Sequence, residues 1–278
     1  MIAPDRFVRF TKMSGAGNDF VVLEAEEAAR IGEFEAWVRA VCRRGVSVGA
    51  DGVLVVGPAE NRRVLVRFHN PDGGEAFCGN GTRCAARFAW MRDWCGADAK
   101  LLTRVGEVDA EILDDRVRVH LPPPVDRGRM TLHAEGVDLV GRHVVAGVPH
   151  FVVPTPDLVH VPIAQLGPRF RRHPHFGDEG TNVDFVAWRR DGSLGIRTWE
   201  RGVEGETLSC GSGAVAAAYA ATLDGAGPEV RVTPWSGIPL RVQFRGPTEA
   251  PFGATLEGDA RVLFQATLSP EATRGIPA

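Results

Sequence analysis

Two short cysteine motifs contain the residues of this chain that are best suited to chemistry. Residues 77–81 read FCGNG and residues 209–213 read SCGSG, so each cysteine is followed by Gly-x-Gly. An alanine-rich stretch follows each motif, and alanine is the strongest helix former. The pattern predicts a helix in each half of the chain that begins beside Cys78 or Cys210.

A cysteine in this position is suited to proton transfer. A free thiol has a pKa of about 8.5, but the unpaired N–H groups of a helix N-terminus stabilise the thiolate. The same N–H groups bind carboxylates, and glycine lets such a ligand approach the backbone closely. When an amino acid loses its α-proton, negative charge develops on its carboxylate, where a helix N-terminus would stabilise it. Two such sites could supply one base to each face of a carbon, so the doubled motif predicts a racemase or an epimerase.

The other three cysteines have a simpler interpretation. A single buried cysteine usually behaves as a small apolar residue, and this is what we predict for Cys42, Cys84 and Cys95. No Cys-x2–4-Cys or His-x3–5-His pair lies near Cys78 or Cys210, so no metal site is predicted. The repetition of the motif is what favours a chemical role for Cys78 and Cys210.

The composition excludes several classes of function. The chain has 278 residues, of which 44% are hydrophobic and 24% charged, and a net charge of −3. That charge offers no basic surface for nucleic acid, and no apolar run approaches the roughly 20 residues that cross a bilayer. The N-terminus lacks the apolar core of a signal peptide, and an odd number of cysteines argues against a disulfide framework. We therefore predict a cytoplasmic protein that binds a small molecule and binds neither nucleic acid nor a membrane.

The scarcity of lysine limits the cofactor chemistry. The 32 Lys and Arg residues include only two lysines, Lys12 and Lys100. Pyridoxal phosphate, the usual cofactor of amino-acid racemisation, requires a lysine that forms a Schiff base with it. Neither lysine is followed by a phosphate-binding loop, so the sequence predicts a reaction without a cofactor.

Short β-rich runs predict strands along the whole chain, at residues 8–13, 20–23, 53–56, 64–68, 105–112, 117–121, 144–145, 151–153, 183–188, 196–199, 240–244 and 262–268 and near Val230. Apolar residues at 34, 37, 38, 41 and 42 predict an amphipathic helix. Strands and helices do not alternate strictly, which favours an α+β fold over a doubly wound sheet. The proline run 122–124 is the best linker. We predict one half at 1–124, joined by 263–278, and another at 125–262.

Six blocks of the sequence resemble the diaminopimelate epimerase family, in the same order along nearly the whole chain: residues 11–20, 70–73, 78–84, 147–150, 180–183 and 200–213. The resemblance implies a cofactor-independent isomerase that interconverts LL- and meso-diaminopimelate in the synthesis of lysine and peptidoglycan precursors. It also implies two pseudo-symmetric halves, each a curled, mostly antiparallel sheet around a central helix, with the active site in the cleft between them. A homodimer is compatible with this resemblance.

The resemblance also implies roles for individual residues. Cys78 and Cys210 would be the two acid/base groups, one a thiolate and the other a thiol in each direction of the reaction. His150 and Glu200 resemble the family pair that adjusts the pKa of these cysteines. The residues expected to bind substrate are Asn18, Asn70, Gly79, Asn80, Asn182, Glu200, Arg201, Gly211 and Ser212.

Within that set, the residues after each cysteine would bind the carboxylate at the reacting centre. Arg201 is suited to a bidentate interaction with the distal carboxylate. Asn18 and Asn70 also have a simpler explanation, because asparagine is common in turns. The motifs alone leave both explanations open.

Two departures from the family bear on the substrate. Val148 stands where the family often has an asparagine that contacts the distal end of the substrate, and Gly52 stands where some members have a polar side chain. An alternative function is therefore a related racemase or epimerase of proline, hydroxyproline or histidine. The presence of Arg201 and Asn182 favours a substrate with a second charged end.

Two further classes of function differ from an epimerase in whether, or how, they use a pair of cysteines. A related isomerase that does not epimerise lacks the paired thiols, so the presence of Cys78 and Cys210 argues against it. A redox switch would join the two cysteines in a disulfide, which would inactivate an enzyme that needs both thiols. We expect such oxidation only as a side reaction.

Overall fold

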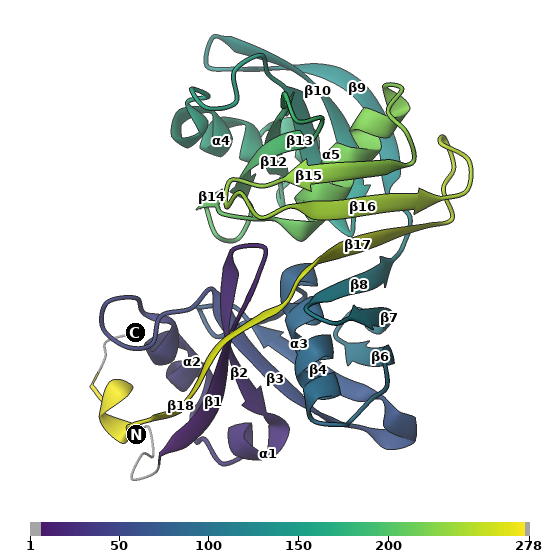
Figure 1. Cartoon of the computed structure of the whole chain (residues 1–278). Helices are drawn as coiled ribbons and strands as arrows, with labels where there is room; N and C mark the ends of the chain where they lie inside the picture. Colours follow the sequence, from purple (N-terminus) through teal and green to yellow (C-terminus); the bar gives the residue numbers. More distant parts are fainter. Residues whose placement is uncertain (1–6, 276–278) are drawn as a thin grey trace. The chain divides into compact units, whose positions relative to one another are not determined.

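The computed structural model describes residues 7–275, which form two compact units (Figure 1). The first unit contains the described residues up to Val119 together with those from Gly258 onward. The second unit contains residues His120–Glu257. The chain therefore leaves the first unit and later returns to it.

The first unit contains a mixed sheet made of β1 (Val8–Gly15), β2 (Asn18–Glu24), β3 (Gly52–Pro58), β4 (Val64–His69), β5 (Glu75–Ala76), β6 (Asp98–Thr103), β7 (Gly106–Leu113), β8 (Arg116–Leu121) and β18 (Arg261–Leu268). The order across the sheet is β18-β1-β2-β3-β4-β6-β7-β8, and β5 pairs with the end of β4. The pairs β2–β3 and β4–β6 are parallel, and the others are antiparallel.

The second unit contains a mixed sheet made of β9 (Val125–Ala134), β10 (Val137–Ala146), β11 (Val148–Pro154), β12 (Asn182–Trp188), β13 (Leu194–Glu200), β14 (Gly205–Thr207), β15 (Glu229–Thr233), β16 (Leu240–Arg245) and β17 (Gly253–Asp259). The unit boundaries fall inside β8 and β17, so the last two residues of each of these strands belong to the other unit. The order is β9-β10-β11-β12-β13-β15-β16-β17, and β14 pairs with the end of β13. The pairs β11–β12 and β13–β15 are parallel.

The two sheets have the same topology. Strands β1 to β8 correspond one by one to β10 to β17, with parallel pairs at the same two places. The register agrees as well, since Phe20 pairs with Gly52 across β2 and β3, and His150 pairs with Asn182 across β11 and β12. The predicted pseudo-symmetric α+β fold is confirmed, and the register identifies equivalent positions in the two units.

One buried helix occupies the middle of each sheet: α3 (Gly79–Met91) in the first unit and α5 (Gly211–Leu223) in the second. Each helix packs against most strands of its own sheet, so the sheet curls around it. Nearly every residue of α5 is buried, and its run of alanines allows the strands to approach closely on all sides. A helix that is apolar all round belongs in a core, and both helices begin where the cysteine motifs predicted.

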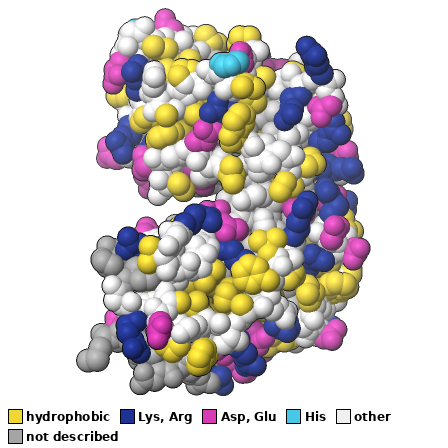
Figure 2. Space-filling model, turned by 60° about the vertical axis from the view of Figure 1, so that its left-hand side comes forward, with side chains coloured by type: hydrophobic (Ala, Val, Ile, Leu, Met, Phe, Trp, Pro, Cys, Tyr) yellow, Lys and Arg dark blue, Asp and Glu magenta, His cyan; other side chains and the backbone are white. Residues whose placement is uncertain are grey.

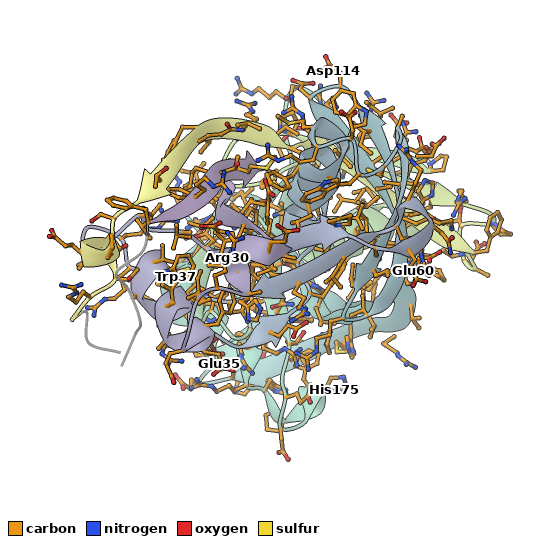
Figure 3. The ribbon with its side chains drawn as sticks, turned by 90° about the horizontal axis from the view of Figure 1, so that it is seen from below. Arg30, Glu35, Trp37, Glu60, Asp114 and His175 are labelled. Atoms are coloured by element: carbon orange, nitrogen blue, oxygen red, sulfur yellow. The ribbon has the colours of Figure 1, made fainter. Side chains whose placement is uncertain are left out.

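Shorter helices cover other faces of the sheets: α1 (Ala25–Ala28), α2 (Phe34–Cys42), α4 (Ile163–Arg171) and the 3-10 turns η1 (Glu60–Arg62), η2 (Pro174–Phe176) and η3 (Pro270–Ala272). The predicted amphipathic helix is α2, and Figure 3 labels two of its residues, Trp37 and Glu35. Trp37 is buried with Val38 and Val41 in a cluster below β2 and β3, whereas Glu35 is exposed. In the second unit, Phe151 and Phe170 form the equivalent cluster beneath α4.

The surface has mixed charge. On the face in Figure 2, Lys and Arg side chains are interspersed with Asp and Glu, in keeping with the net charge of −3. No helix among residues 7–275 is long and apolar enough to cross a membrane. Within the same residues, no group of three or more His, Cys, Asp or Glu side chains is placed to bind a metal ion.

Candidate functional site

Cys78 and Cys210 are the N-cap residues of the two buried helices. Cys78 has an extended backbone (φ −137°, ψ 114°), and its Sγ accepts a hydrogen bond from the N–H of Gly81 at 3.4 Å. Cys210 has nearly the same geometry (φ −120°, ψ 116°), and its Sγ accepts from the N–H of Gly213 at 3.4 Å. Each sulfur thus takes the place of the side-chain oxygen that usually caps a helix.

The surroundings of Cys210 oppose the effect of its helix. Burial, together with the carboxylates of Glu200 and Asp184, raises the pKa of the Cys210 thiol well above its ordinary value. Hydrogen bonds to Ser212 and to the N–H of Gly213 counteract this only in part. Desolvation therefore outweighs the helix N-terminus that the sequence pointed to, and it favours the neutral thiol at Cys210.

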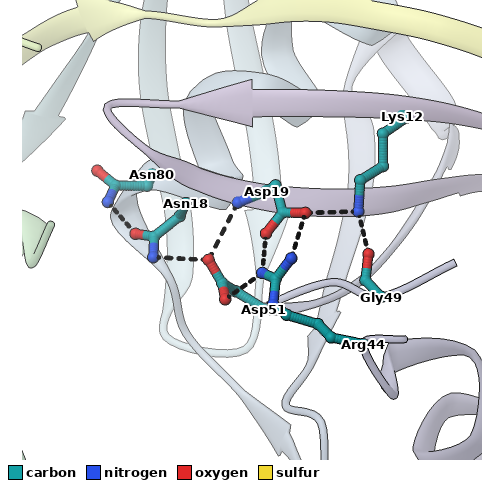
Figure 4. Close-up of polar contacts among 7 residues, drawn as sticks. All are labelled: Lys12, Asn18, Asp19, Arg44, Gly49, Asp51 and Asn80. Carbon is teal, nitrogen blue, oxygen red and sulfur yellow. Dashed lines mark hydrogen bonds and ion pairs between the residues drawn. The ribbon is translucent and has the colours of Figure 1, made fainter. Parts of the chain in front are cut away.

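In the first unit, the structure brings two of the predicted binding residues together at the start of α3. The side-chain amide of Asn80 donates a hydrogen bond to Oδ1 of Asn18 (Figure 4). The Asn18 amide in turn donates to Oδ2 of Asp51 at 3.1 Å. The same oxygen accepts a hydrogen bond from the N–H of Asp19 at 3.1 Å, so the turn between β1 and β2 is tied to the start of β3.

A network of charged side chains lies beside Asn18. Lys12, whose side chain is only 6% exposed, forms an ion pair with Asp19 at 2.7 Å and donates to the carbonyl of Gly49 (Figure 4). Arg44 bridges Asp19 and Asp51, with its Nη2 atom 2.8 Å from Oδ1 of Asp51. The network fixes the backbone on both sides of Asn18. It also gives the buried Lys12 a structural role.

This network makes part of the stability depend on pH. Burial alone would raise the pKa of Asp19, but its bonds to Arg44 and Lys12 outweigh that and hold the pKa below 3.8. A carboxyl with a depressed pKa contributes stability above its unfolded pKa, and that contribution is lost as the pH falls through the folded value. We expect Asp19→Asn to be less stable than the wild type at pH 7 and to lose less stability below about pH 4.

Urea unfolding at a series of pH values measures this difference. Asp178→Asn is a control, because Asp178 is an exposed carboxylate elsewhere in the chain. Parallel wild-type and Asp19→Asn curves across the acid range would contradict the assignment.

In the second unit, His150 is hydrogen-bonded to Asp184, and Asp184 packs against α5. Nδ1 of His150 lies 2.7 Å from Oδ2 of Asp184, and both side chains are completely buried. The hydroxyl of Thr198 donates to Oδ1 of Asp184 at 2.7 Å. A Cβ atom added to Gly213, in the first turn of α5, would lie only 2.8 Å from Oδ1 of Asp184. Asp184 therefore packs directly against the helix turn that follows Cys210.

Asn182 connects His150 to Arg201. Its Nδ2 atom lies 3.3 Å from Nε2 of His150, and its Oδ1 accepts a hydrogen bond from the backbone N–H of Arg201 at 2.7 Å. The guanidinium of Arg201, 24% exposed, pairs with the carboxylate of Glu179 at 2.7 Å. Glu179 is 84% exposed, so the side chain that now binds Arg201 lies almost entirely in solvent.

The remaining predicted residues lie where the motifs placed them. Gly79 and Gly211 are the first residues of α3 and α5, and the hydroxyl of Ser212 is 3.4 Å from Sγ of Cys210. Asn70 follows β4, in a turn closed by a hydrogen bond from its N–H to the carbonyl of Gly74 at 2.9 Å. Its turn role is confirmed, and its role in binding substrate stays a prediction.

Gly52 cannot be replaced by the polar side chain found in some family members without local movement. A Cβ atom at Gly52 would lie 2.3 Å from the ring of Phe68 and 2.6 Å from the carbonyl of His69. The ring of Phe68 thus occupies the space that such a side chain would need. Val148, the other departure, begins β11 and is partly exposed.

Three residues of this site were missed in the sequence: Asp184, Asp51 and Glu179. A signal existed for Asp184, because it interrupts the otherwise apolar run of residues 183–188 within β12. A charged residue in such a strand requires a partner, which here is His150. Asp51 and Glu179 lie in polar loops, where a carboxylate carries no such signal.

The chain is similar to known proteins along most of its length. The family described as "Diaminopimelate epimerase" matches residues 10–126 and 143–247. The diaminopimelate epimerase of Aquifex aeolicus is 37% identical over 279 residues, which cover 95% of this chain and 99% of that protein. Solved structures of lower identity share the fold. A probable proline racemase from Agrobacterium radiobacter K84 has a TM-score of 0.71, 17% identity and coverage of 96% of this chain and 95% of that one.

A second such structure is a phenazine biosynthesis protein of the PhzF family from Bacillus anthracis. It has a TM-score of 0.71, 15% identity and coverage of 95% of this chain and 99% of that one. These structures support the fold, while the identity to the curated relatives identifies the family. With its cysteine-capped helices and its end-to-end match to the Aquifex aeolicus protein, the chain belongs to the diaminopimelate epimerase family of isomerases.

Proposed function

We propose that this protein interconverts LL- and meso-diaminopimelate without a cofactor, by proton transfer between the substrate and the two thiols. The observation that carries the proposal is the pair of cysteine N-caps, one on the buried helix of each unit. We place the reaction in the synthesis of lysine and of peptidoglycan precursors, in the cytoplasm.

In this mechanism, one cysteine enters as a thiolate and removes the α-proton, becoming a thiol. The other cysteine enters as a thiol and delivers a proton to the opposite face of the same carbon, becoming a thiolate. The helix N–H groups after Cys78 and Cys210 stabilise the carboxylate on which the negative charge develops. One proton is taken and one is returned, so neither an oxidant nor a cofactor is required.

The two units contribute different polar groups to substrate binding. Asn18 and Asn80 form one hydrogen-bonded pair beside Cys78, and they can turn toward the substrate because each amide has further donors and acceptors. Asn182 holds the backbone of Arg201, whose guanidinium is suited to the distal carboxylate. His150 and Glu200 would adjust the pKa of the two cysteines, and Glu200 is one of the groups that raise the pKa of Cys210.

The carboxylate of Glu179 already pairs with the guanidinium of Arg201, which the distal carboxylate of the substrate would need. Glu179 therefore competes with the substrate. We expect Glu179→Gln to lower KM for diaminopimelate by up to about fivefold with little change in kcat, because exposed ion pairs contribute about 0.2–1 kcal/mol. Initial rates at several substrate concentrations measure this effect. Asp178→Asn is the matched control, since it removes an equal charge from the adjacent exposed residue. An unchanged or raised KM in Glu179→Gln would refute the competition.

Proton NMR in D2O tests the proposed function directly. Reduced enzyme with LL-diaminopimelate, and no pyridoxal phosphate, should cause loss of the α-proton signal and appearance of the meso isomer. L-Proline, trans-4-hydroxy-L-proline and L-histidine serve as comparison substrates. Exchange with one of these and none with diaminopimelate would move the substrate to the alternative class and leave the two-thiol chemistry in place.

A further inference from the structure

The repeated topology allows the surroundings of the two thiols to be compared position by position. Across the parallel strand pairs, Leu54 pairs with Val22 just as Asp184 pairs with Val152, so Leu54 and Asp184 are equivalent. Independent contacts agree. A Cβ atom at Gly81 would meet Leu54 at 3.1 Å, and one at Gly213 would meet Asp184 at 2.8 Å.

The equivalent positions differ in charge. Where the second unit has the carboxylates Asp184 and Glu200, the first has Leu54 and Asn70, which carry none. The two helices also differ in charge, but here the charged residue is a cation and lies in the first unit. The fifth residue after Cys78 is Arg83, whereas the fifth after Cys210 is Val215. At these equivalent positions, the second unit therefore has two carboxylates that the first lacks, and the first has a guanidinium that the second lacks.

Arg83 is unusual in its own right. Its side chain is completely buried, and its Nη1 and Nη2 atoms have no hydrogen-bond partner. Its only described hydrogen bond runs from Nε to the carbonyl of Asp259, at a long 3.5 Å. A guanidinium is always charged in proteins, and a buried charge without a partner is costly. Such a residue requires a nearby negative charge.

The groups around Arg83 leave few candidates for that charge. The ionisable groups that act on it are Cys84, Asp259, Cys78 and Arg116. The carboxylate of Asp259 already pairs with Arg261 at 2.6 Å and accepts from the N–H of Ala16 at 2.7 Å.

Of the three remaining groups, the two cysteines can carry a negative charge, and they differ in their ability to ionise. Burial raises the pKa of Cys84 to about 12, so it stays a neutral thiol. Arg116 adds a second positive charge. Cys78 is the group that is both partly exposed and capped by helix N–H groups.

We propose that Arg83 is a positioning residue that keeps the negative charge of the site on Cys78, so that the enzyme rests with Cys78 as thiolate and Cys210 as thiol. The role of these thiols in epimerisation rests on the function proposed above, whereas the order of their ionisation can be measured without substrate. The two units are thus alike in fold, but the equivalent positions beside their cysteines differ in charge. One substrate isomer meets an enzyme that is already in the required state, and the other requires the charge to move to Cys210.

Alkylation of the wild-type enzyme tests this order. Iodoacetamide reacts with thiolates, and peptide mass spectrometry reports the rate at each cysteine as a function of pH. Because the midpoint of each rate profile is compared, different exposure of the two sulfurs does not decide the outcome. We expect a midpoint for Cys78 below about 8.5 and a midpoint for Cys210 well above it. The reverse order would overturn the proposal, whether or not the enzyme turns over diaminopimelate.

Variants at Arg83 test whether this residue is what favours the thiolate of Cys78. Arg83→Met should raise the midpoint of Cys78 by about one unit, a roughly tenfold loss of thiolate at neutral pH, and leave that of Cys210 in place. Arg83→Lys, which retains the charge, should restore most of the shift. If Arg83→Met does not fold, Arg83→Gln provides a second neutral variant. A Cys78 midpoint that is the same in neutral and charged variants would overturn the role of Arg83.

Discussion

Replacing either Cys78 or Cys210 by alanine is expected to abolish epimerisation. In the proposed mechanism each thiol supplies one of the two proton-transfer steps, and general acid–base catalysis typically contributes about 10²–10⁴-fold to a rate. Because both steps are needed for inversion, we expect a fall of at least about 10³-fold in kcat for either variant. Conversion of LL- to meso-diaminopimelate, followed by proton NMR, measures this loss.

The exchange of the α-proton with solvent deuterium adds information that inversion does not. A variant with one thiol can still remove and return a proton on one face, so slow exchange without inversion is the signature of a two-base mechanism. Cys95→Ala is the matched control, because Cys95 is a buried cysteine that follows the C-terminal end of α3. If Cys78→Ala or Cys210→Ala inverted the substrate at near wild-type rate, the two-base mechanism would be wrong.

Asp184→Ala is expected to have the largest effect on stability. The carboxylate is completely buried and accepts hydrogen bonds at both oxygens, one from His150 and one from Thr198. Removing one partner of a buried pair leaves the other partner without compensation and typically costs about 3–5 kcal/mol. We expect Asp184→Ala to lower the free energy of unfolding by about 3 kcal/mol, measured by urea denaturation.

A second His–Asp pair, on the surface of the chain, serves as the control for the buried pair of His150 and Asp184. His133 and Asp138 form an equally short contact of 2.6 Å, but their side chains are 68% and 65% exposed. Asp138→Ala should therefore change stability little, because solvent replaces the lost partner. We also expect kcat to fall in Asp184→Ala, since His150 loses the group that orients its ring. Equal effects of Asp184→Ala and Asp138→Ala would show that the buried pair is not what stabilises this unit.

Local patterns in the sequence were sufficient for the features that depend on neighbouring residues. The glycines after Cys78 and Cys210 and the alanines that follow predicted the two central helices and their caps. The apolar stripe on α2 predicted that helix with its buried Trp37. In these cases, the information lies within a few turns of the chain.

Features that depend on distant residues could not be predicted. The strand β9 was missed because much of it is exposed and polar and it contains a glycine, so it lacks a clear strand pattern. The pairing of His150 with Asp184 depends on a parallel register between strands that are separated by α4. Likewise, the pKa of Cys210 is raised by its burial and by the carboxylates of Glu200 and Asp184, which together outweigh the helix N-terminus visible in the motif.

The return of the chain to the first unit has a consequence for synthesis. The first strand, β1, has β2 on one side and β18 on the other, and β18 comes only after the whole second unit. While the chain is being made, one edge of β1 therefore stays open until residues 261–268 have emerged. Open strand edges are templates for pairing with other chains, and contacts so distant in sequence form slowly. A chain shortened before β18 would carry that open edge permanently, so its hazard is aggregation as much as loss of activity.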